Sequence, residues 1–250
     1  MKVAPVKTRK ITPKDKDIFA ILKKYLAGRL HEGCVVAVTS KIVSICEGRV
    51  ALIQGNDKIK LAMKEADLYY PLSKSKYQVL LTIKNHRIGF TSGIDESNGA
   101  GYLVLWPLNP QKSANQIRSF LAKEFKLKKV GVVITDTTSS PLLRGQRGMF
   151  IAHSGFSALN SYINQPDIFG RKLKMTRSAV ADALSTAAVL VMGEGKEQTP
   201  LAVIENVPFV KFQQRNPTSF ELREIRMEPK DDLYAPLLKA VKWKKGEHTP

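Results

Sequence analysis

The stretch KVGVVITDTT, residues Lys129–Thr138, carries an apolar run directly into acidic and hydroxyl side chains. A run of Val and Ile bounded by Lys and Asp predicts a buried β-strand. Residues at the end of such a strand are held by the sheet and still reach solvent, so we expect Asp136 and Thr137 in a turn that presents oxygen ligands. Mg²⁺ and Mn²⁺ favour such ligands. The alternative for these two residues is a local cap or an Asx-turn.

A second oxygen-rich loop, Thr91–Gly99, follows a short expected strand, Arg87–Phe90. Its glycines let the backbone approach a phosphate closely, and Asp95 and Asn98 are near enough in sequence to address a metal and a phosphate together. An ordinary surface loop is the alternative interpretation. Two such turns after two strands suit a divalent ion shared with nucleotide phosphates, because each ion takes one or two carboxylates plus phosphate oxygens.

These turns and several further blocks resemble the coenzyme F420-0 gamma-glutamyl ligases, and more closely the bacterial branch named for folate metabolism gamma-glutamate ligases. The resemblance covers most of the chain. Its blocks, in chain order, are Pro5–Thr8, Thr39–Ser44, Glu47–Val50, Ser92–Asn98, Val104–Pro107, Asp136–Thr137, Arg144–Gly145, Asp167–Leu173, Val180–Leu184 and Leu190–Gly195.

The resemblance implies an amide ligase in which GTP, or ATP, phosphorylates a carboxylate of the acceptor. The amine of L-glutamate then attacks the acyl phosphate. Mg²⁺ or Mn²⁺ would bridge the phosphates and offset their charge, and a homodimer is implied as well. The implied acceptor is folate or a related gamma-glutamyl compound, with F420-0 of deazaflavin coenzyme biosynthesis as the alternative.

The resemblance also assigns site residues, position by position. Asp95 and Asp136 match metal ligands, and Thr137 matches a ligand of the second ion. Glu194 stands where the family commonly has Gln as a metal ligand. Arg144 is expected to join Asp95 and Asp136 in catalysis, because a guanidinium can bind a carboxylate or phosphate through two hydrogen bonds; a surface ion pair is its alternative. The positions expected to bind the nucleotide are Thr8, Arg9, Lys10, Ile11, Ser40, Lys41, Asn98, Met192, Gly193 and Gly195.

Two positions depart from the family pattern. Thr8–Lys10 replaces the usual Gly-Leu-Pro after the first strand, and Ile45 stands where the family has the second Lys of Ser-Lys-Ile-Val-Ser-Lys. Base and phosphate recognition are therefore expected to differ from the family's. Lys41 is a candidate for the missing charge, with a solvated turn lysine as the alternative.

Apolar spacing elsewhere predicts helices alternating with strands, and no phosphate-loop motif is found. We therefore expect an α+β fold of mixed sheets with packed helices, neither Rossmann nor P-loop. It would form a single ligase domain over residues 1–250, with two intertwined lobes. The expected helices are Ile18–Leu26 after a cap at Thr12–Asp15, Lys58–Asp67, one starting at Asn109, and Thr176–Met192; the expected strands include Met1–Lys7, Val35–Val38, which would end in a turn at Thr39–Lys41, Val79–Lys84 and Leu201–Ile204.

Composition is that of a soluble enzyme, with 250 residues of which 43% are hydrophobic. No apolar run is long enough to span a membrane, and the N-terminus lacks the apolar core of a signal peptide, so a cytoplasmic protein is expected. Cys34 and Cys46 lie in apolar contexts without metal-ligand spacing, which predicts buried free thiols.

The net charge of +18, from 40 Lys and Arg against 22 Asp and Glu, raises the rival hypothesis of a basic nucleic-acid-binding protein. The lysines are scattered along the chain, and no helix-turn-helix, zinc-finger or RNP-type pattern is visible. We therefore expect no specific nucleic-acid partner. A positive field would instead favour capture of a nucleotide, glutamate and an anionic acceptor.

Overall fold

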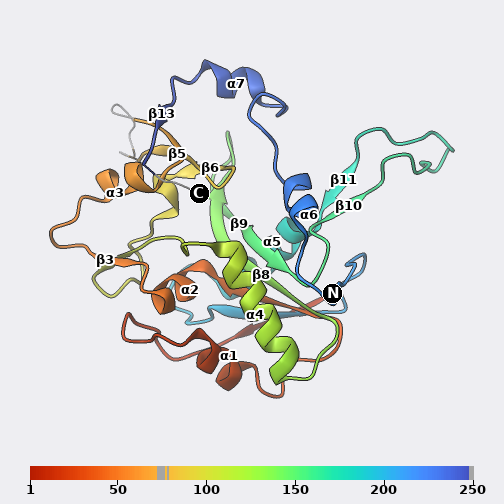
Figure 1. The fold of residues 1–250 in the computed structure, drawn as a ribbon, viewed down its shortest axis with the longest axis horizontal. Coiled ribbons are helices and arrows are strands. Elements are labelled where there is room, and N and C mark those ends of the chain that lie inside the picture. Colours follow the sequence, from red (N-terminus) through yellow and green to blue (C-terminus); the bar gives the residue numbers. More distant parts are fainter. Residues whose placement is uncertain (72–76, 78, 248–250) are drawn as a thin grey trace. The chain divides into compact units, whose positions relative to one another are not determined.

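The computed structural model describes residues 1–71, 77 and 79–247. The chain forms two compact units, each built from three chain segments. Unit 1 comprises Met1–Lys10, Asp17–Val43 and Asn109–Glu221. Unit 2 comprises Ile11–Lys16, Ser44–Leu108 and the chain from Leu222 onward. Both contain helices and strands (Figure 1), which confirms the expected α+β class, while the single ligase domain stays a prediction.

Unit 1 is built on a five-stranded mixed sheet with the strand order β1-β12-β2-β8-β9. β2 and β8 run parallel, and every other neighbouring pair is antiparallel. The central strands are rich in Val, Ile, Leu and Ala, and most of these side chains are buried, which is typical of strands covered on both faces. The strands are β1 (Lys2–Val6), β2 (Cys34–Thr39), β8 (Val130–Ser139), β9 (Gln146–Ser154) and β12 (Leu201–Glu205).

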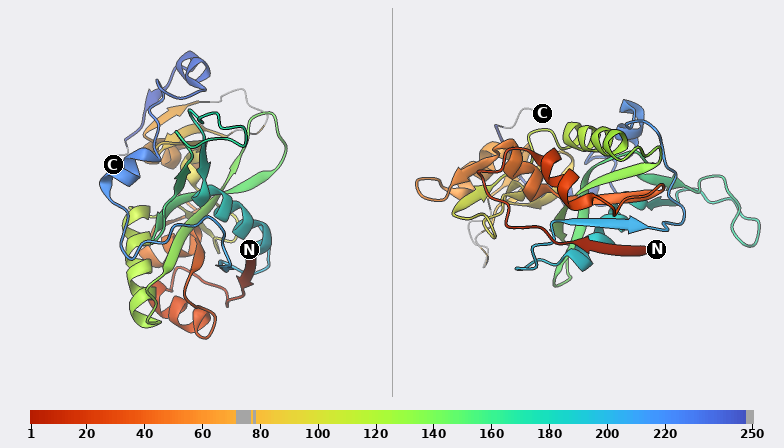
Figure 2. Two further views of the ribbon diagram at one scale, coloured as in Figure 1. Left: turned by 90° about the vertical axis from the view of Figure 1, so that its right-hand side faces the viewer. Right: turned by 90° about the horizontal axis from the view of Figure 1, so that it is seen from below.

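Helices cover both faces of this sheet. α1 (Ile18–Leu26) and α4 (Pro110–Glu124) lie on one face, and α5 (Val180–Met192) lies on the other (Figure 2). The rings of Phe19 and Phe120, 4.9 Å apart between centroids, join α1 to α4. The start of α4 agrees with the sequence: the Asn109 side chain caps it and proline occupies its first turn.

The expected cap at Thr12–Asp15 is wrong. Thr12 and Asp15 close a turn of their own, in which the Thr12 amide donates to the Asp15 carboxylate at 2.8 Å. The helix begins later, because the Asp17 carboxylate accepts the amides of Phe19 and Ala20 at 2.9 and 3.0 Å. The Thr-Pro-x-Asp pattern therefore stabilised a turn, and the neighbouring Asp supplied the cap.

Two further boundaries differ from the prediction. No turn ends β2, because the chain passes from Thr39 straight into α2 (Ser40–Glu47). α5 starts at Val180, since the preceding residues form β11 (Arg177–Ala179) and pair with β10 (Leu159–Ser161). Backbone groups engaged in that ladder are not available to extend the helix.

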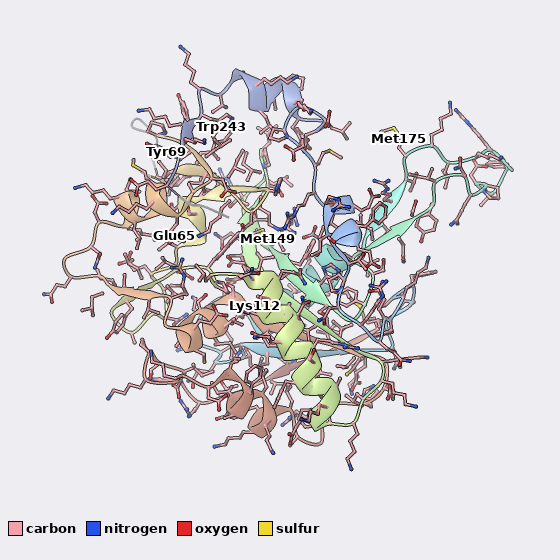
Figure 3. The ribbon with its side chains drawn as sticks, in the orientation of Figure 1. Glu65, Tyr69, Lys112, Met149, Met175 and Trp243 are labelled. Atoms are coloured by element: carbon pink, nitrogen blue, oxygen red, sulfur yellow. The ribbon has the colours of Figure 1, made fainter. Side chains whose placement is uncertain are left out.

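Unit 2 contains a four-stranded antiparallel sheet, a short two-stranded sheet and several short helical segments in the described residues. The buried core is aliphatic and includes Ala62, Leu80 and Leu103. The last strand pairs Lys244 with Tyr69, which lies near Trp243 in Figure 3. The elements are β3 (Val50–Leu52), α3 (Lys58–Glu65), β4 (Leu68–Tyr70), β5 (Leu81–Lys84), β6 (Arg87–Phe90), η1 (Thr91–Gly93), β7 (Tyr102–Val104), α7 (Ala235–Ala240) and β13 (Lys244–Lys245), while α6 (Ser219–Glu224) crosses the boundary between the two segments of chain.

Both cysteines, Cys34 and Cys46, are buried free thiols, as expected. Burial raises the pKa of the Cys34 thiol above its ordinary value, so this thiol stays protonated and unreactive.

Among the residues with described positions, none of the helices has the length and apolarity needed to cross a membrane.

Candidate active site

Asp136 and Thr137 lie within β8 and not in a turn after it. The strand continues to Ser139, and an irregularity in its pairing with β9 falls between Ile134 and Thr135. From Asp136, one residue beyond this irregularity, the side chains become half-buried, so the strand leaves the core just after the bulge. The Thr137 amide donates to the Asp136 carboxylate at 2.9 Å. This bond joins adjacent residues within the strand and is not an Asx-turn, which would reach the residue two positions on.

The strand partner of this segment explains how it is held. Asp136 is paired with Met149 (Figure 3), and Thr137 with Gly148. Gly148 is required there, because a Cβ at this position would lie 2.5 Å from the Ser185 carbonyl of α5. The helix therefore packs directly on the backbone opposite Thr137, which fixes the outer part of β8 on a rigid element.

The register of the five strands brings several predicted residues to one end of the sheet. Val6 is paired with Leu201, Leu201 with Val38, and Val38 with Ile134. Beyond these positions β1 and β2 end, whereas β8 continues at the same end of the sheet. The predicted residues that follow lie at this end. They are Thr8, Ser40 and Asp136, all predicted as site residues from the sequence.

The loop after α5 reaches this same end. The Gln198 carbonyl accepts the Thr8 amide at 2.8 Å, and the Pro200 carbonyl accepts the Thr39 amide at 3.0 Å. The Thr199 hydroxyl donates to the Met192 carbonyl, which ties the end of α5 to the segment entering β12. Unit 1 thus brings three predicted nucleotide-binding segments to the same end of the sheet: Thr8, Ser40 and Met192–Gly195.

Within this loop, Glu197 has a part that the sequence interpretation missed. Its carboxylate accepts the Gly195 amide at 2.8 Å, and a Cβ at Gly193 would collide with the Glu197 side chain. Gly193 has φ +76°, a value that favours glycine. Glu194 is exposed. The glycines at 193 and 195 were the available signal, since they leave room for the Glu197 carboxylate to fold back on the loop.

The second acidic loop is ordered inside unit 2. Asp95 exchanges both backbone hydrogen bonds with Val104, at 2.9 and 2.7 Å. Its carboxylate accepts the Ser97 amide at 2.8 Å and the Ser97 hydroxyl at 3.1 Å. Asn98 is exposed and has φ +54°, in the left-handed region that Asn tolerates. Asp95 is thus a half-buried residue with a fixed backbone, followed by an exposed loop.

The remaining candidates occupy less constrained positions. Arg144 is exposed in the loop between β8 and β9, and Lys41 is half-buried in the first turn of α2. The Arg9 amide donates to the Tyr25 hydroxyl at 3.1 Å, and its guanidinium to the Lys10 carbonyl at 2.9 Å. Ile11 belongs to unit 2. Arg9 and Lys10 are exposed, and Ile11 is half-buried.

The donor chemistry of the candidates fits a hard divalent ion. Carboxylate and hydroxyl oxygens at Asp136 and Thr137 are donors that Mg²⁺ and Mn²⁺ prefer. Across the described part of the chain, no three His, Cys, Asp or Glu side chains are grouped closely enough to cage a metal. Mg²⁺ does not require such a cage, since it commonly binds through one or two carboxylates and completes its shell with water and substrate phosphates.

A partly buried charged cluster in unit 2 was not predicted. Glu65, at the end of α3 (Figure 3), contacts both Arg49 and Lys84. Burial by itself would raise the pKa of the Glu65 carboxyl, but hydrogen bonds from the two cations hold it below its ordinary value. The only signal in the sequence was Arg49, within the block Glu47–Val50. Lysine and glutamate on short amphipathic elements are ordinarily solvent-exposed.

Comparison with known proteins matches most of the chain to one family. Residues 5–206 match the family model described as F420-0:Gamma-glutamyl ligase. The chain is 35% identical over 197 residues to the coenzyme F420:L-glutamate ligase of Methanococcus maripaludis strain C6, covering 72% of this chain and 78% of that protein. The proteins of the same name from Methanocaldococcus jannaschii and Archaeoglobus fulgidus are 34% and 30% identical, covering 72% and 83% of this chain and 79% and 88% of theirs. The chain therefore belongs to the F420-0:gamma-glutamyl ligase family.

Proposed function

We propose that this protein is a nucleotide-dependent gamma-glutamyl ligase that joins L-glutamate to a carboxylate of an F420-type deazaflavin acceptor. The observation that carries the proposal is the match to the ligase family over residues 5–206. The relatives are named for coenzyme F420, which favours the deazaflavin acceptor over the folate acceptor expected first from the sequence.

The proposed reaction has two steps. An acceptor carboxylate oxygen attacks the γ-phosphorus of GTP or ATP, the bond to the β-phosphate oxygen breaks, and an acyl phosphate and nucleoside diphosphate form. The glutamate amine then attacks the acyl carbon, phosphate leaves, and the nitrogen loses a proton. When bound, Mg²⁺ or Mn²⁺ would offset phosphate charge during these steps.

The residues of unit 1 support this chemistry by their placement at one end of the sheet. In the proposal, Asp136 and Thr137 hold an ion from the rigid outer part of β8, and Glu194 contributes a further carboxylate. Thr8, Ser40 and the loop Met192–Gly195 contact the nucleotide. Backbone amides next to glycines suit phosphate oxygens, because no side chain blocks their approach.

The other assigned residues complete the proposal. Asp95 acts as a further metal ligand and Asn98 as a nucleotide contact, as the family resemblance implies. Arg144 binds a carboxylate or phosphate of the substrates. The nucleotide is contacted further by Lys41, Arg9, Lys10 and Ile11. The proposed assembly is a homodimer. The net charge of +18 would raise the rate at which these anionic substrates are captured, an effect that salt weakens.

Phosphate release tests the proposal. Purified protein is given GTP or ATP, Mg²⁺ or Mn²⁺, L-glutamate, and either F420-0, F420 or a reduced folate. We expect phosphate release only when glutamate and a deazaflavin acceptor are both present, and the faster nucleotide identifies the co-substrate. Release with the folate alone would transfer the proposal to that acceptor, and equal release without any acceptor would contradict ligation.

Oxygen-18 tests the acyl phosphate. An acceptor whose carboxylate carries oxygen-18 should pass one labelled oxygen to inorganic phosphate, because that oxygen becomes the bridge between carbon and phosphorus. Product formed with unlabelled phosphate would exclude this intermediate while leaving the ligase assignment intact.

A further inference from the structure

The Asp95 loop of unit 2 is backed by a buried tryptophan. Trp106 is 4% exposed, and a Cβ placed on Gly93 would overlap the Nε1 edge of its indole ring. Gly93 also has φ +69°, which favours glycine. The Gly93 backbone therefore lies directly against Trp106, two residues before Asp95.

Trp106 is in turn held by Arg49. The Arg49 Nε donates to the Trp106 carbonyl at 3.1 Å, and the Arg49 carbonyl accepts the Leu105 amide at 3.0 Å. Leu105 follows Val104, the residue that exchanges both backbone hydrogen bonds with Asp95. One arginine thus fixes the strand that pairs with Asp95 and the backbone of Trp106, whose ring supports the preceding turn.

The Arg49 side chain is itself fixed by the half-buried carboxylate of Glu65, which the buried Lys84 also contacts. Its Nη2 lies 2.6 Å from Glu65 Oε2, and the same oxygen lies 2.5 Å from Lys84 Nζ. The side chain of Lys84 is 3% exposed, and its ammonium stands 5.9 Å from the centroid of the Trp106 ring. Glu65 thus holds two cations in one geometry, and each cation loses its compensation if the carboxylate moves.

We propose that Arg49, Glu65 and Lys84 are positioning residues that hold Trp106 and thereby set the place of Asp95 as a metal ligand. The proposal rests on the function proposed above, in which Asp95 binds a divalent ion. Groups that orient a ligand typically change metal affinity or activity about 10- to 100-fold when removed. A purely structural network would instead change stability and leave the affinity of correctly folded protein unaltered.

Glu65→Gln tests the proposal, because the amide keeps the shape of the side chain and removes its charge. Mn²⁺ affinity is read from the electron paramagnetic resonance signal of free Mn²⁺, with protein saturated by a non-hydrolysable GTP analogue and the analogue alone as a blank. We expect a rise in the Mn²⁺ dissociation constant of about tenfold or more. Ile117→Val, a core truncation in α4 of unit 1, is the control for lost stability and should bind Mn²⁺ as the wild type does.

A double-variant cycle separates positioning from general damage. If Glu65 acts through Asp95, the combined variant Glu65→Gln/Asp95→Asn should bind Mn²⁺ no more weakly than Asp95→Asn alone, whereas independent effects would add. Additive losses, or wild-type affinity in Glu65→Gln beside weakened Asp95→Asn, overturn the positioning role alone. Wild-type affinity in Asp95→Asn would remove Asp95 from the metal site. It would overturn both the positioning role and the proposed role of Asp95 as a metal ligand.

Trp106→Phe repeats the test if Glu65→Gln does not fold. It keeps a buried aromatic ring but removes the pyrrole edge that touches Gly93. Weakened Mn²⁺ binding that is non-additive with Asp95→Asn supports the proposal, and unchanged binding contradicts it.

Discussion

Asp136 stands where a fully buried strand reaches the surface, since Val132–Ile134 have no exposed area while Asp136 itself is half-buried. Asp136→Asn keeps the size of the side chain and removes its charge. We expect turnover to fall roughly 100-fold or more, because stabilisation of transferring phosphate is lost. The free energy of unfolding should change by less than about 1 kcal/mol. Steady-state kinetics beside thermal melts would show this, and near-normal turnover at limiting metal would favour a capping role.

Glu194 differs from Asp136 in being exposed in a loop. If it is a ligand, Glu194→Gln should stay active but need more Mg²⁺ or Mn²⁺ for half-maximal rate, because an amide oxygen still coordinates a hard cation without adding charge. Glu194→Ala should be far worse. Metal titration of both variants decides the matter, with Glu197→Gln as a test of the loop's internal hydrogen bond to Gly195. Wild-type metal dependence in Glu194→Ala would remove Glu194 from the site.

Glu65 gives the protein a pH-dependent contribution to stability. Hydrogen bonds from Arg49 and Lys84 outweigh burial and hold the pKa of its carboxyl below the ordinary value of 4.5. A depressed pKa stabilises the folded state fully above the unfolded pKa and loses that effect as pH falls through the folded value. The stability difference between wild type and Glu65→Gln should therefore be constant at neutral pH and shrink below the ordinary pKa of 4.5. Denaturant melts over the acid range measure it, and a constant difference would contradict the ion pairing.

Local chemistry made some residues predictable and others not. The Asn109 cap and the buried Val and Ile of β8 follow from neighbours in the chain, so the sequence predicts them. The hydrogen bond between Thr8 and Gln198 joins residues far apart in sequence, and no local pattern encodes it. Glu65 was missed for the same reason, because its burial depends on partners brought from β5 and from the turn before β3.

At the scale of elements, the packing of α5 on β9 holds the part of β8 that contains Asp136 in place. Gly148→Ala would place a Cβ 2.5 Å from the Ser185 carbonyl and 2.8 Å from Val189 Cβ. We expect a loss of about 1–3 kcal/mol in unfolding free energy, as overpacking in well-packed regions typically gives, together with reduced turnover. Gly89→Ala is the matched control, since nothing lies within 4 Å of its added Cβ. Equal melting temperatures for the two variants would show that α5 moves freely relative to β9.

Element boundaries were predicted correctly where a helix cap or a run of buried residues sets them. They were predicted wrongly where strand pairing competes with helix formation. α3 and β12 agree closely with the expectation, whereas α5 lost its first residues to the β10–β11 ladder. α2 was missed because Thr39–Lys41 was interpreted as a turn, whereas the chain passes from Thr39 directly into the helix Ser40–Glu47. The α+β class survived these errors, since class depends on the number and kind of elements more than on their ends.

At the scale of the whole molecule, the charge of +18 and the family membership point to different partners unless the charge serves anionic substrates. A ligase should bind nucleic acid only weakly, without sequence preference, and lose that binding at moderate salt. A filter-binding titration of the protein with DNA and RNA over a range of salt concentrations measures this, and tight, salt-resistant binding to a defined nucleic acid would contradict the ligase account.

The mass of the product tests the central claim most directly. The protein is incubated with F420-0, L-glutamate, GTP and Mn²⁺, and the acceptor is analysed by mass spectrometry beside an Asp136→Asn reaction. We predict an acceptor heavier by one glutamyl residue in the wild-type reaction, absent when glutamate or nucleotide is omitted and strongly reduced with the variant. An acceptor of unchanged mass, from folded protein that consumes nucleotide, would contradict the assignment as a deazaflavin gamma-glutamyl ligase.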